Sequence, residues 1–96
     1  MKQVQLLFSN RIMLEDTKSM QLDYSLMESV SEEDHLTPYY GIKISKFLGE
    51  TVEMDEVAGI STSKESVVFI LKKLFQFEVT PISMVEIVDE LVTQGL

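Results

Sequence analysis

The residues with the clearest potential for chemistry lie together in one acidic stretch, Glu32-Glu33-Asp34-His35. Carboxylates and imidazoles are groups that bind metal ions or transfer protons. A calcium-type loop, however, spaces its oxygen ligands at alternate positions and turns at a glycine, and this stretch does neither. His35 is the only histidine and cysteine is absent, so any Ser-His or Cys-His pair would depend on this loop. We interpret the stretch as a solvated loop and predict no catalytic residue, no metal and no cofactor.

The chain is about the size of one small domain. It has 96 residues, of which 45% are hydrophobic and 25% charged, as in ordinary globular proteins. We expect a single domain over residues 1–96, with residues 1–19 as a peripheral strand or arm. The lack of cysteine suits the cytosol, the first eight residues are too interrupted for a signal peptide, and no apolar run reaches transmembrane length. We therefore predict a cytoplasmic protein that makes no membrane contact.

The chain is strongly acidic, and the acid is concentrated in its second half. Eight basic and sixteen acidic residues give a net charge of −8. Residues 1–48 carry five basic and seven acidic side chains, whereas residues 49–96 carry three and nine. Because such a surface repels phosphate groups, we exclude free nucleic acid and anionic membranes as partners. It would attract a basic protein, although a merely solvated acidic surface explains the same charge.

Alternation of apolar and polar residues predicts antiparallel strands in the first two thirds of the chain. Residues 20–26 alternate without a fault, which is the period of a half-buried strand. Residues 11–15 are expected to pair with them through a turn at 16–18. Residues 4–8 are interpreted as an irregular or edge strand.

A second hairpin is expected after the acidic stretch. The alternation returns between Pro38 and Leu48, and a turn at Gly49-Glu50-Thr51 leads into another strand. The alternation slips by one residue at Asp55-Glu56, which predicts a β-bulge there. Loops of two and of three residues both fit the turn, so the register stays open.

Two capped amphipathic segments follow and predict two helices. Thr62 and Glu65 form a capping box for the first, Thr80 followed by Pro81 starts the second, and Gly95 ends it. Strands followed by helices define an α+β fold, with an antiparallel sheet of three to five strands and two C-terminal helices packed on one face. The apolar arcs are Val67, Val68, Ile70, Leu71, Leu74, Phe75 and Phe77 in the first helix, and Met84, Val85, Ile87, Val88, Leu91 and Val92 in the second.

Four short motifs occur in order along the chain: Tyr40-Gly41-Ile42, Ile60-Ser61, Val79-Thr80-Pro81 and the acidic segment 86–91. Together they resemble a family of small uncharacterised proteins from spore-forming Gram-positive bacteria. The resemblance covers residues 20–92 and leaves the first 19 residues outside. It implies a recurring cytoplasmic fold of unknown function, so it assigns no catalytic or binding residue.

The two helices also invite a helix-turn-helix interpretation, in which the second helix would enter the major groove of DNA. The exposed side of that helix carries Glu86, Asp89 and Glu90 and no basic residue. Because this side would meet phosphates, we favour a helix pair packed on the sheet.

Three apolar residues of the sheet fall on the face away from the core. Met27, Tyr39 and Phe47 share this face with polar residues, so we expect them to be partly exposed and to form a modest patch. Tyr40 falls in phase with the core, and Gly41 is expected to permit close packing or a local bend.

Phe69 is the aromatic residue whose position a core does not explain. On a helical wheel it lies among Glu65, Lys72, Lys73 and Gln76, nearly opposite the apolar arc. Either the N-terminal segment or the lysine stems shield it, or it anchors a contact with another copy or another protein. The favoured hypothesis is a non-enzymatic interaction module that self-associates or binds a protein through Phe69, Lys72 and Lys73.

Two other hypotheses come from different classes of protein. An acidic regulator would occupy a basic site on a nucleic-acid-binding protein, with Glu78, Glu86, Asp89 and Glu90 in place of phosphates. A small enzyme is the least favoured, because the groups that transfer protons near neutral pH are almost absent.

Overall fold

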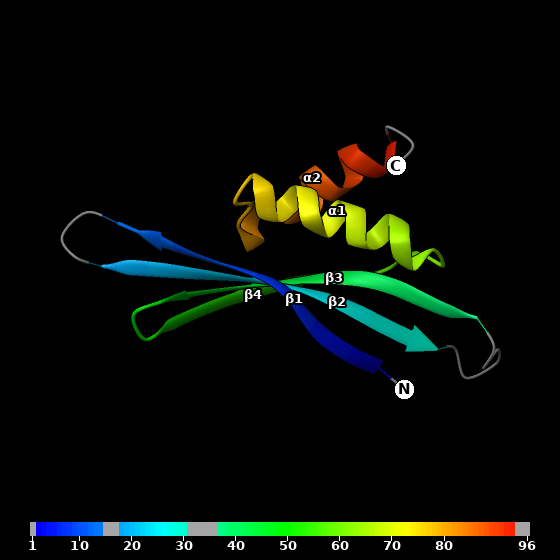
Figure 1. Ribbon diagram of the computed structural model, residues 1–96, viewed down its shortest axis with the longest axis horizontal. Helices are drawn as coiled ribbons and strands as arrows, with labels where there is room; N and C mark the ends of the chain where they lie inside the picture. Colours follow the sequence, from blue (N-terminus) through cyan, green and yellow to red (C-terminus); the bar gives the residue numbers. More distant parts are fainter. Residues whose placement is uncertain (1, 15–17, 31–36, 94–96) are drawn as a thin grey trace.

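The computed structural model describes residues 2–14, 18–30 and 37–93 (Figure 1). Four strands come first and two helices follow, which confirms the predicted α+β class. The strands are β1 (Lys2–Met13), β2 (Ser19–Val30), β3 (Pro38–Leu48) and β4 (Thr51–Ser61), and the helices are α1 (Lys64–Gln76) and α2 (Pro81–Thr93).

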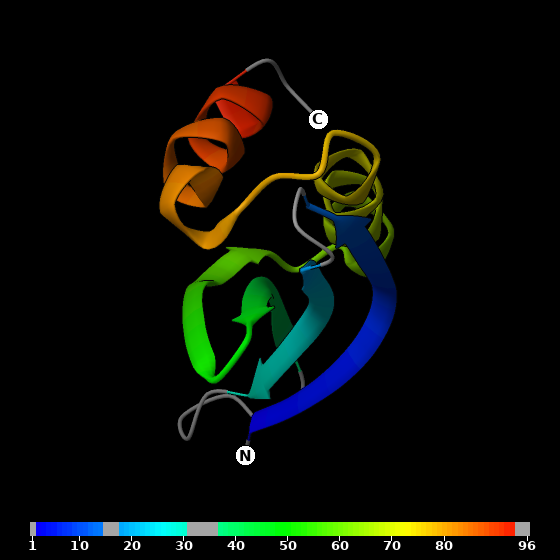
Figure 2. The ribbon, with the colours of Figure 1, turned by 90° about the vertical axis from the view of Figure 1, so that its left-hand side faces the viewer.

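The strands form one antiparallel sheet in the order β1-β2-β3-β4, so each strand pairs with the next along the chain. Both helices lie on the same side of the sheet, as Figure 1 shows. Seen along its length, the sheet is strongly twisted and curved (Figure 2). α1 contacts all four strands, whereas α2 contacts β3 and β4.

The N-terminal segment is a full edge strand of the sheet. β1 pairs with β2 over its whole length, and the register shifts between Leu6 and Phe8. The two short strands expected from the sequence are therefore one strand with a bulge. The turn expected at 16–18 falls mostly on residues outside the described part.

The turn between β3 and β4 has two residues, Gly49 and Glu50, with Leu48 paired to Thr51. Gly49 has a φ of 59°, a left-handed conformation that glycine adopts without steric cost. This turn fixes the register that the sequence left open.

The bulge in β4 lies farther along the strand than predicted. Asp55 and Glu56 pair regularly with β3, so the bulge predicted at these residues is wrong. The register shifts after Val57 instead. A Cβ on Gly41 would meet the Val57 carbonyl oxygen and would lie 2.9 Å from the Cα of Ala58. The bulge thus sits opposite the one β3 residue without a side chain, as expected for a glycine that permits close packing.

The core lies between the sheet and the two helices. Its members are aliphatic side chains and one tyrosine, each shielded from water. Burial of one such side chain contributes about 1.5–3 kcal/mol to the free energy of unfolding. The fully buried members are Leu22, Tyr24, Ile42, Ile44, Val67, Ile70, Leu71, Leu74, Met84 and Val88.

The start of α1 differs by one residue from the prediction. Ser63 is the N-cap, and its hydroxyl accepts a hydrogen bond from the Ser66 backbone N–H at 3.3 Å. The capping box between Thr62 and Glu65 is therefore wrong. Serine is as good a cap as threonine, so the sequence signal was correct in kind and displaced by one position.

The end of α1 shows that Phe77 does not belong to the apolar arc predicted for this helix. Glu78 adopts a positive φ of 53°, and the Val79 N–H donates to the Leu74 carbonyl at 3.0 Å. This arrangement closes the helix in a Schellman-like turn. Phe77 consequently lies beyond the last helical residue and is exposed.

α2 starts at Pro81 as predicted, and Gly95 lies outside the described residues. Its buried residues are Pro81, Met84 and Val88. Val85 and Val92, which we assigned to the apolar arc, are exposed. The reason is that α2 rests on β3 and the edge strand β4, which cover a narrower part of the helix than predicted.

The sheet face away from the helices agrees with the prediction at two of three residues. Tyr39 and Phe47 are exposed, but Met27 is only 2% exposed, so its assignment to a surface patch is wrong. Met27 lies next to Gly41 in the register. Because the β4 backbone comes close over Gly41, it covers this part of the face.

Candidate functional site

The outward side of α1 contains the aromatic residue that the sequence singled out. Phe69 is 44% exposed, and the Lys73 ammonium lies 5.4 Å from the centre of its ring, within the range of a cation–π contact. Phe69, Lys72, Lys73 and Gln76 line a shallow hollow of about 130 Å³. We call these four residues the α1 face. The Lys73 ammonium therefore lies over the Phe69 ring, and almost half of this side chain remains accessible.

The α1 face points outward because the opposite side of the helix is held firmly. Phe8 of β1 stacks on Phe75 with ring centres 4.9 Å apart. The Asn10 side chain donates to the Phe75 carbonyl at 3.0 Å. The hydroxyl of Tyr24 donates to the Val79 carbonyl at 3.0 Å. These contacts attach the end of α1 to β1 and β2, so β1 reaches Phe75 and not Phe69.

Tyr24 is the described residue whose titration is most strongly shifted. Burial raises the pKa of its phenol to about 12, and the negative charge of Glu78 acts in the same direction. The hydrogen bond with Asn10 acts in the opposite direction. At neutral pH the phenol is protonated and donates to Val79, which is a structural role.

The outward side of α2 combines exposed apolar and acidic residues. Ile82 is 80% exposed, and Val85 is 44% exposed. Glu86, Asp89 and Glu90 are exposed on the same helix, which contains no basic residue. We call these five residues the α2 face. The sequence analysis assigned no role to Ile82, although on a helical wheel it lies opposite the buried Met84.

The structure keeps the two sets of candidate residues on separate helices. Among the described residues, no ion pair joins Lys72 or Lys73 to an acid of α2. The salt bridge of the described sheet joins Lys46 to Glu53 across β3 and β4. The basic and acidic faces are therefore both accessible to other molecules.

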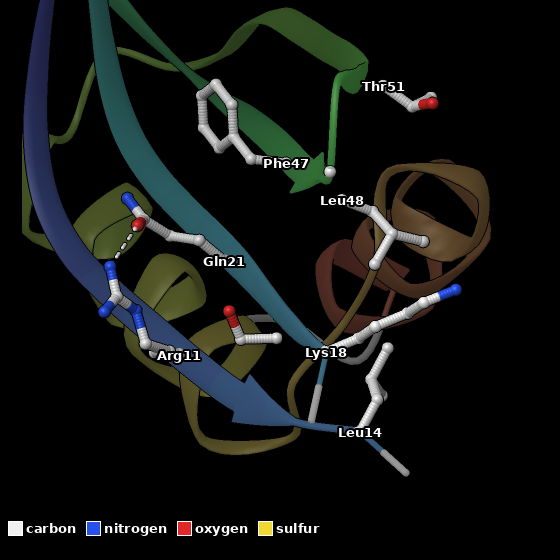
Figure 3. A pocket seen from close by; sticks show the side chains of 9 residues that line it. Arg11, Leu14, Lys18, Gln21, Phe47, Leu48 and Thr51 are labelled. Carbon is white, nitrogen blue, oxygen red and sulfur yellow. Dashed lines mark hydrogen bonds between the residues drawn. The ribbon is translucent and has the colours of Figure 1, made fainter. Parts of the chain in front are cut away.

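A larger hollow of about 630 Å³ lies at one end of the sheet (Figure 3). It is located between the end of the β1–β2 pair and the β3–β4 turn, which diverge at this end of the molecule (Figure 1). Its lining residues are Arg11, Leu14, Lys18, Ser19, Gln21, Phe47, Leu48, Gly49 and Thr51.

A chain of hydrogen bonds runs along one wall of this hollow. The Arg11 guanidinium donates to Gln21 at 3.4 Å, as the dashed line in Figure 3 shows. Gln21 in turn donates to Asp23 at 2.9 Å, and the Ser9 hydroxyl donates to the same carboxylate oxygen at 2.7 Å. Asp23 therefore accepts two hydrogen bonds from neutral groups and lies outside the lining. The sequence analysis did not find this hollow, because it forms only when two hairpins diverge.

The acidic stretch Glu32-Glu33-Asp34-His35 lies outside the described residues. Within residues 2–14, 18–30 and 37–93, no cluster of three or more His, Asp or Glu side chains could hold a metal ion. None of the helices in the described ranges has the length and apolarity to cross a membrane.

The fold defines the class of protein: a four-stranded antiparallel meander with two C-terminal helices on one face and exposed side chains on both helices. Residues 3–94 match the family described as "Family of unknown function (DUF6514)", and the chain belongs to this family. The match includes β1, so the narrower range of 20–92 inferred from the motifs was wrong. No curated protein and no solved structure matches the chain significantly.

Proposed function

We propose that this protein is a non-enzymatic, cytoplasmic interaction module that pairs with a second copy of itself through the α1 and α2 faces. One observation carries the proposal. The two faces have opposite charges, and each exposes a large apolar side chain, Phe69 on α1 and Ile82 on α2. Exposed aromatic and aliphatic residues flanked by charges are typical of protein interfaces.

Charge favours a contact between unlike faces. Two α1 faces would bring Lys72 and Lys73 of one copy against the same lysines of the other. Two α2 faces would bring six carboxylates together, because each face has three acidic residues. An α1 face against an α2 face pairs opposite charges and places Phe69 near Ile82. In a two-fold dimer this contact would occur twice.

Charge reversal on each face separately is the direct test. One variant carries Lys72→Glu and Lys73→Glu, and the other carries Glu86→Lys and Glu90→Lys. Each variant alone is expected to be monomeric in sedimentation equilibrium, because its contact now joins like charges. An equimolar mixture is expected to form a one-to-one dimer, because opposite charges face each other again. Two variants that each associate like wild type, or a mixture that stays monomeric, would overturn the proposal.

Two further variants separate the contact from the fold. Phe69→Ser is expected to weaken association and to leave the circular dichroism spectrum unchanged, because Phe69 lies outside the core. Glu50→Lys changes a charge in the distant β3–β4 turn and should associate like wild type. Loss of the folded spectrum in Phe69→Ser would instead assign this residue to the core.

Features of the whole sequence support the other parts of the proposal. Cysteine is absent, which suits a cytoplasmic location, and a single histidine offers little for acid–base catalysis. The net charge of −8 opposes binding to nucleic acid or to an anionic membrane. A source among spore-forming Gram-positive bacteria, implied by the motif resemblance, belongs to the same proposal.

A second candidate is favoured by the exposure of Glu86, Asp89 and Glu90 together on α2. As an acidic regulator, the protein would occupy a basic site on a nucleic-acid-binding protein. The wild-type chain would then stay monomeric and bind a cationic probe such as polylysine, less tightly as salt is raised. Neutralisation of the three acids by Glu86→Gln, Asp89→Asn and Glu90→Gln should abolish this binding. Binding that survives neutralisation would exclude this candidate.

A further inference from the structure

The hollow at the end of the sheet is distinct from both helix faces. Its volume of about 630 Å³ lies within the range of pockets that hold small molecules, roughly 300–1,000 Å³. It is lined by β1, β2, β3 and the start of β4, and by no residue of α1 or α2. What it binds is therefore independent of the pairing proposed above.

The described lining of the hollow is basic, whereas the protein as a whole is acidic. Among the nine described lining residues, Arg11 and Lys18 are basic and none is acidic. The whole chain has twice as many acidic as basic residues, sixteen against eight. Asp23 is occupied by Ser9 and Gln21, and Glu50 lies in the adjacent turn outside the lining. The side chains that line the described part of the hollow thus make a local basic site on an acidic molecule.

The two basic groups have few partners of their own. Among the described residues, Arg11 uses its guanidinium in one long hydrogen bond, to Gln21 at 3.4 Å. A guanidinium has five N–H donors, so most of them remain available to a ligand. No described acid forms a salt bridge with Arg11 or Lys18. Arginine is suited to this role, because it can bind a carboxylate or phosphate with two parallel hydrogen bonds.

The remaining walls of the hollow are mostly apolar. Phe47 presents an aromatic ring on the same side as Arg11 and Gln21, and Leu48 and Leu14 lie toward Lys18 (Figure 3). Phe47 is exposed although it is a large aromatic residue. Apolar walls with a few polar groups are the usual composition of a small-molecule site.

We propose that this hollow binds a small organic anion that combines a carboxylate, sulfonate or phosphate group with an apolar body. Arg11 binds the anionic group, and Lys18 adds electrostatic attraction from the other side. Phe47 and Leu48 contact the apolar body. Thr51 and Ser19 supply hydroxyl groups at the rim.

The test uses two fluorescent probes that differ in charge. 8-Anilino-1-naphthalenesulfonate has an aromatic body with a sulfonate, and N-phenyl-1-naphthylamine has the same body without it. Fluorescence titration of the folded protein is expected to show one saturable site for the anionic probe and weaker binding of the neutral probe. Equal affinity for both probes, or no saturable binding, would overturn the proposal.

Substitutions locate the site. Arg11→Gln should lower the affinity for the anionic probe by about tenfold, the effect of losing one charge-assisted hydrogen bond of roughly 1.5 kcal/mol. Phe47→Ser should lower the affinity for both probes. Lys64→Gln, which removes an exposed charge at the start of α1, should have no effect. Ile82→Ser controls for probe bound on the α2 face.

The outcomes of this test do not depend on the proposed pairing. Arg11 and Phe47 lie on the sheet, so their variants should retain the association state of wild type in sedimentation. Arg11→Lys keeps the charge and should retain more affinity than Arg11→Gln, which guards against a general loss of structure. If the Arg11→Gln and wild-type proteins bind the anionic probe equally, the hollow is not its site and the proposal fails.

Discussion

α1 and α2 have the same length of 13 residues and lie on the same side of the sheet, but the sheet holds them differently. α1 buries four aliphatic side chains and is attached to β1 and β2 through Asn10, Phe8 and Tyr24. α2 buries three residues, and its main contacts with the sheet are to β3 and β4.

Because of this difference, more apolar side chains remain exposed on α2 than on α1. The sequence of α2 is the more apolar of the two, yet Ile82, Val85 and Val92 remain exposed. A helix placed over an edge strand has too little sheet beneath it to cover a broad apolar arc. α1 is therefore the structural helix and presents a single exposed aromatic residue, whereas α2 provides a wider contact surface. Substitutions should have correspondingly different effects on the two helices.

The largest effect is expected from truncation in α1. Leu71→Ala should lower the free energy of unfolding by about 3 kcal/mol, because it leaves a cavity in the core. Val92→Ala in α2 should lower it by less than about 1 kcal/mol, because Val92 is exposed. Urea denaturation followed by circular dichroism measures both. Equal losses would show that α2 is held as firmly as α1.

The next effect concerns the support beneath α2. Gly41→Ala places a Cβ against the backbone of Val57 and Ala58, which cannot move as easily as a side chain. We expect a loss of about 2–3 kcal/mol in the free energy of unfolding, as for other overpacked sites. The control is Gly49→Ala, where nothing lies within 4 Å of the new Cβ and the cost comes from the positive φ alone. An unchanged free energy of unfolding in Gly41→Ala would mean that β4 does not pack closely over β3.

The attachment of α1 can be tested through pH. The pKa of Tyr24 rises from 10.0 to about 12 on folding, so the folded state retains the phenol proton more tightly. Its stabilising contribution is complete below pH 10 and is lost as the pH rises toward 12. A shift of this size corresponds to about 2.7 kcal/mol.

Tyr24→Phe is the matched variant for this measurement. At neutral pH it should lose about 1 kcal/mol, because the Val79 carbonyl loses its hydrogen-bond donor. Between pH 10 and 12 its stability should fall less steeply than that of wild type. Parallel curves for the two proteins in urea denaturation at several pH values would show that the phenol does not ionise differently on folding.

The smallest effect is expected at the junction between the helices. Glu78 has a φ of 53°, a conformation that costs most residues free energy and that glycine adopts readily. Glu78→Gly should therefore raise the free energy of unfolding by up to about 1 kcal/mol. Glu78→Ala, which keeps a Cβ, should bring no such gain. Destabilisation by the glycine would show that the Glu78 side chain holds α1 and α2 together.

Local patterns in the sequence were enough to predict the fold class but not the surface. The alternation in residues 20–26 and the Thr80-Pro81 start were confirmed because each depends on neighbours in the chain. The bulge after Val57 and the burial of Met27 depend on how β4 passes over Gly41, which no local pattern records.

The candidate sites also divide into those that a local sequence pattern predicts and those that depend on tertiary structure. Helical periodicity correctly placed Phe69 opposite the core, but it left open whether other groups cover this residue, which the structure shows to be 44% exposed. The same periodicity places Ile82 opposite the buried Met84, so its exposure could have been predicted. The exposure of Val85 follows from the narrow support of α2, and the hollow follows from the divergence of two hairpins. These last two are properties of tertiary structure, so the sequence alone could not reveal them.

The mass of the wild-type protein in solution tests the central claim most directly. Sedimentation equilibrium over a range of concentrations, at low and moderate salt, is the measurement. We predict a reversible equilibrium between a monomer of 11.0 kDa and a dimer of twice that mass, weakened by salt because unlike charges meet at the contact. A monomer at every concentration and salt would contradict the claim that α1 and α2 pair between copies.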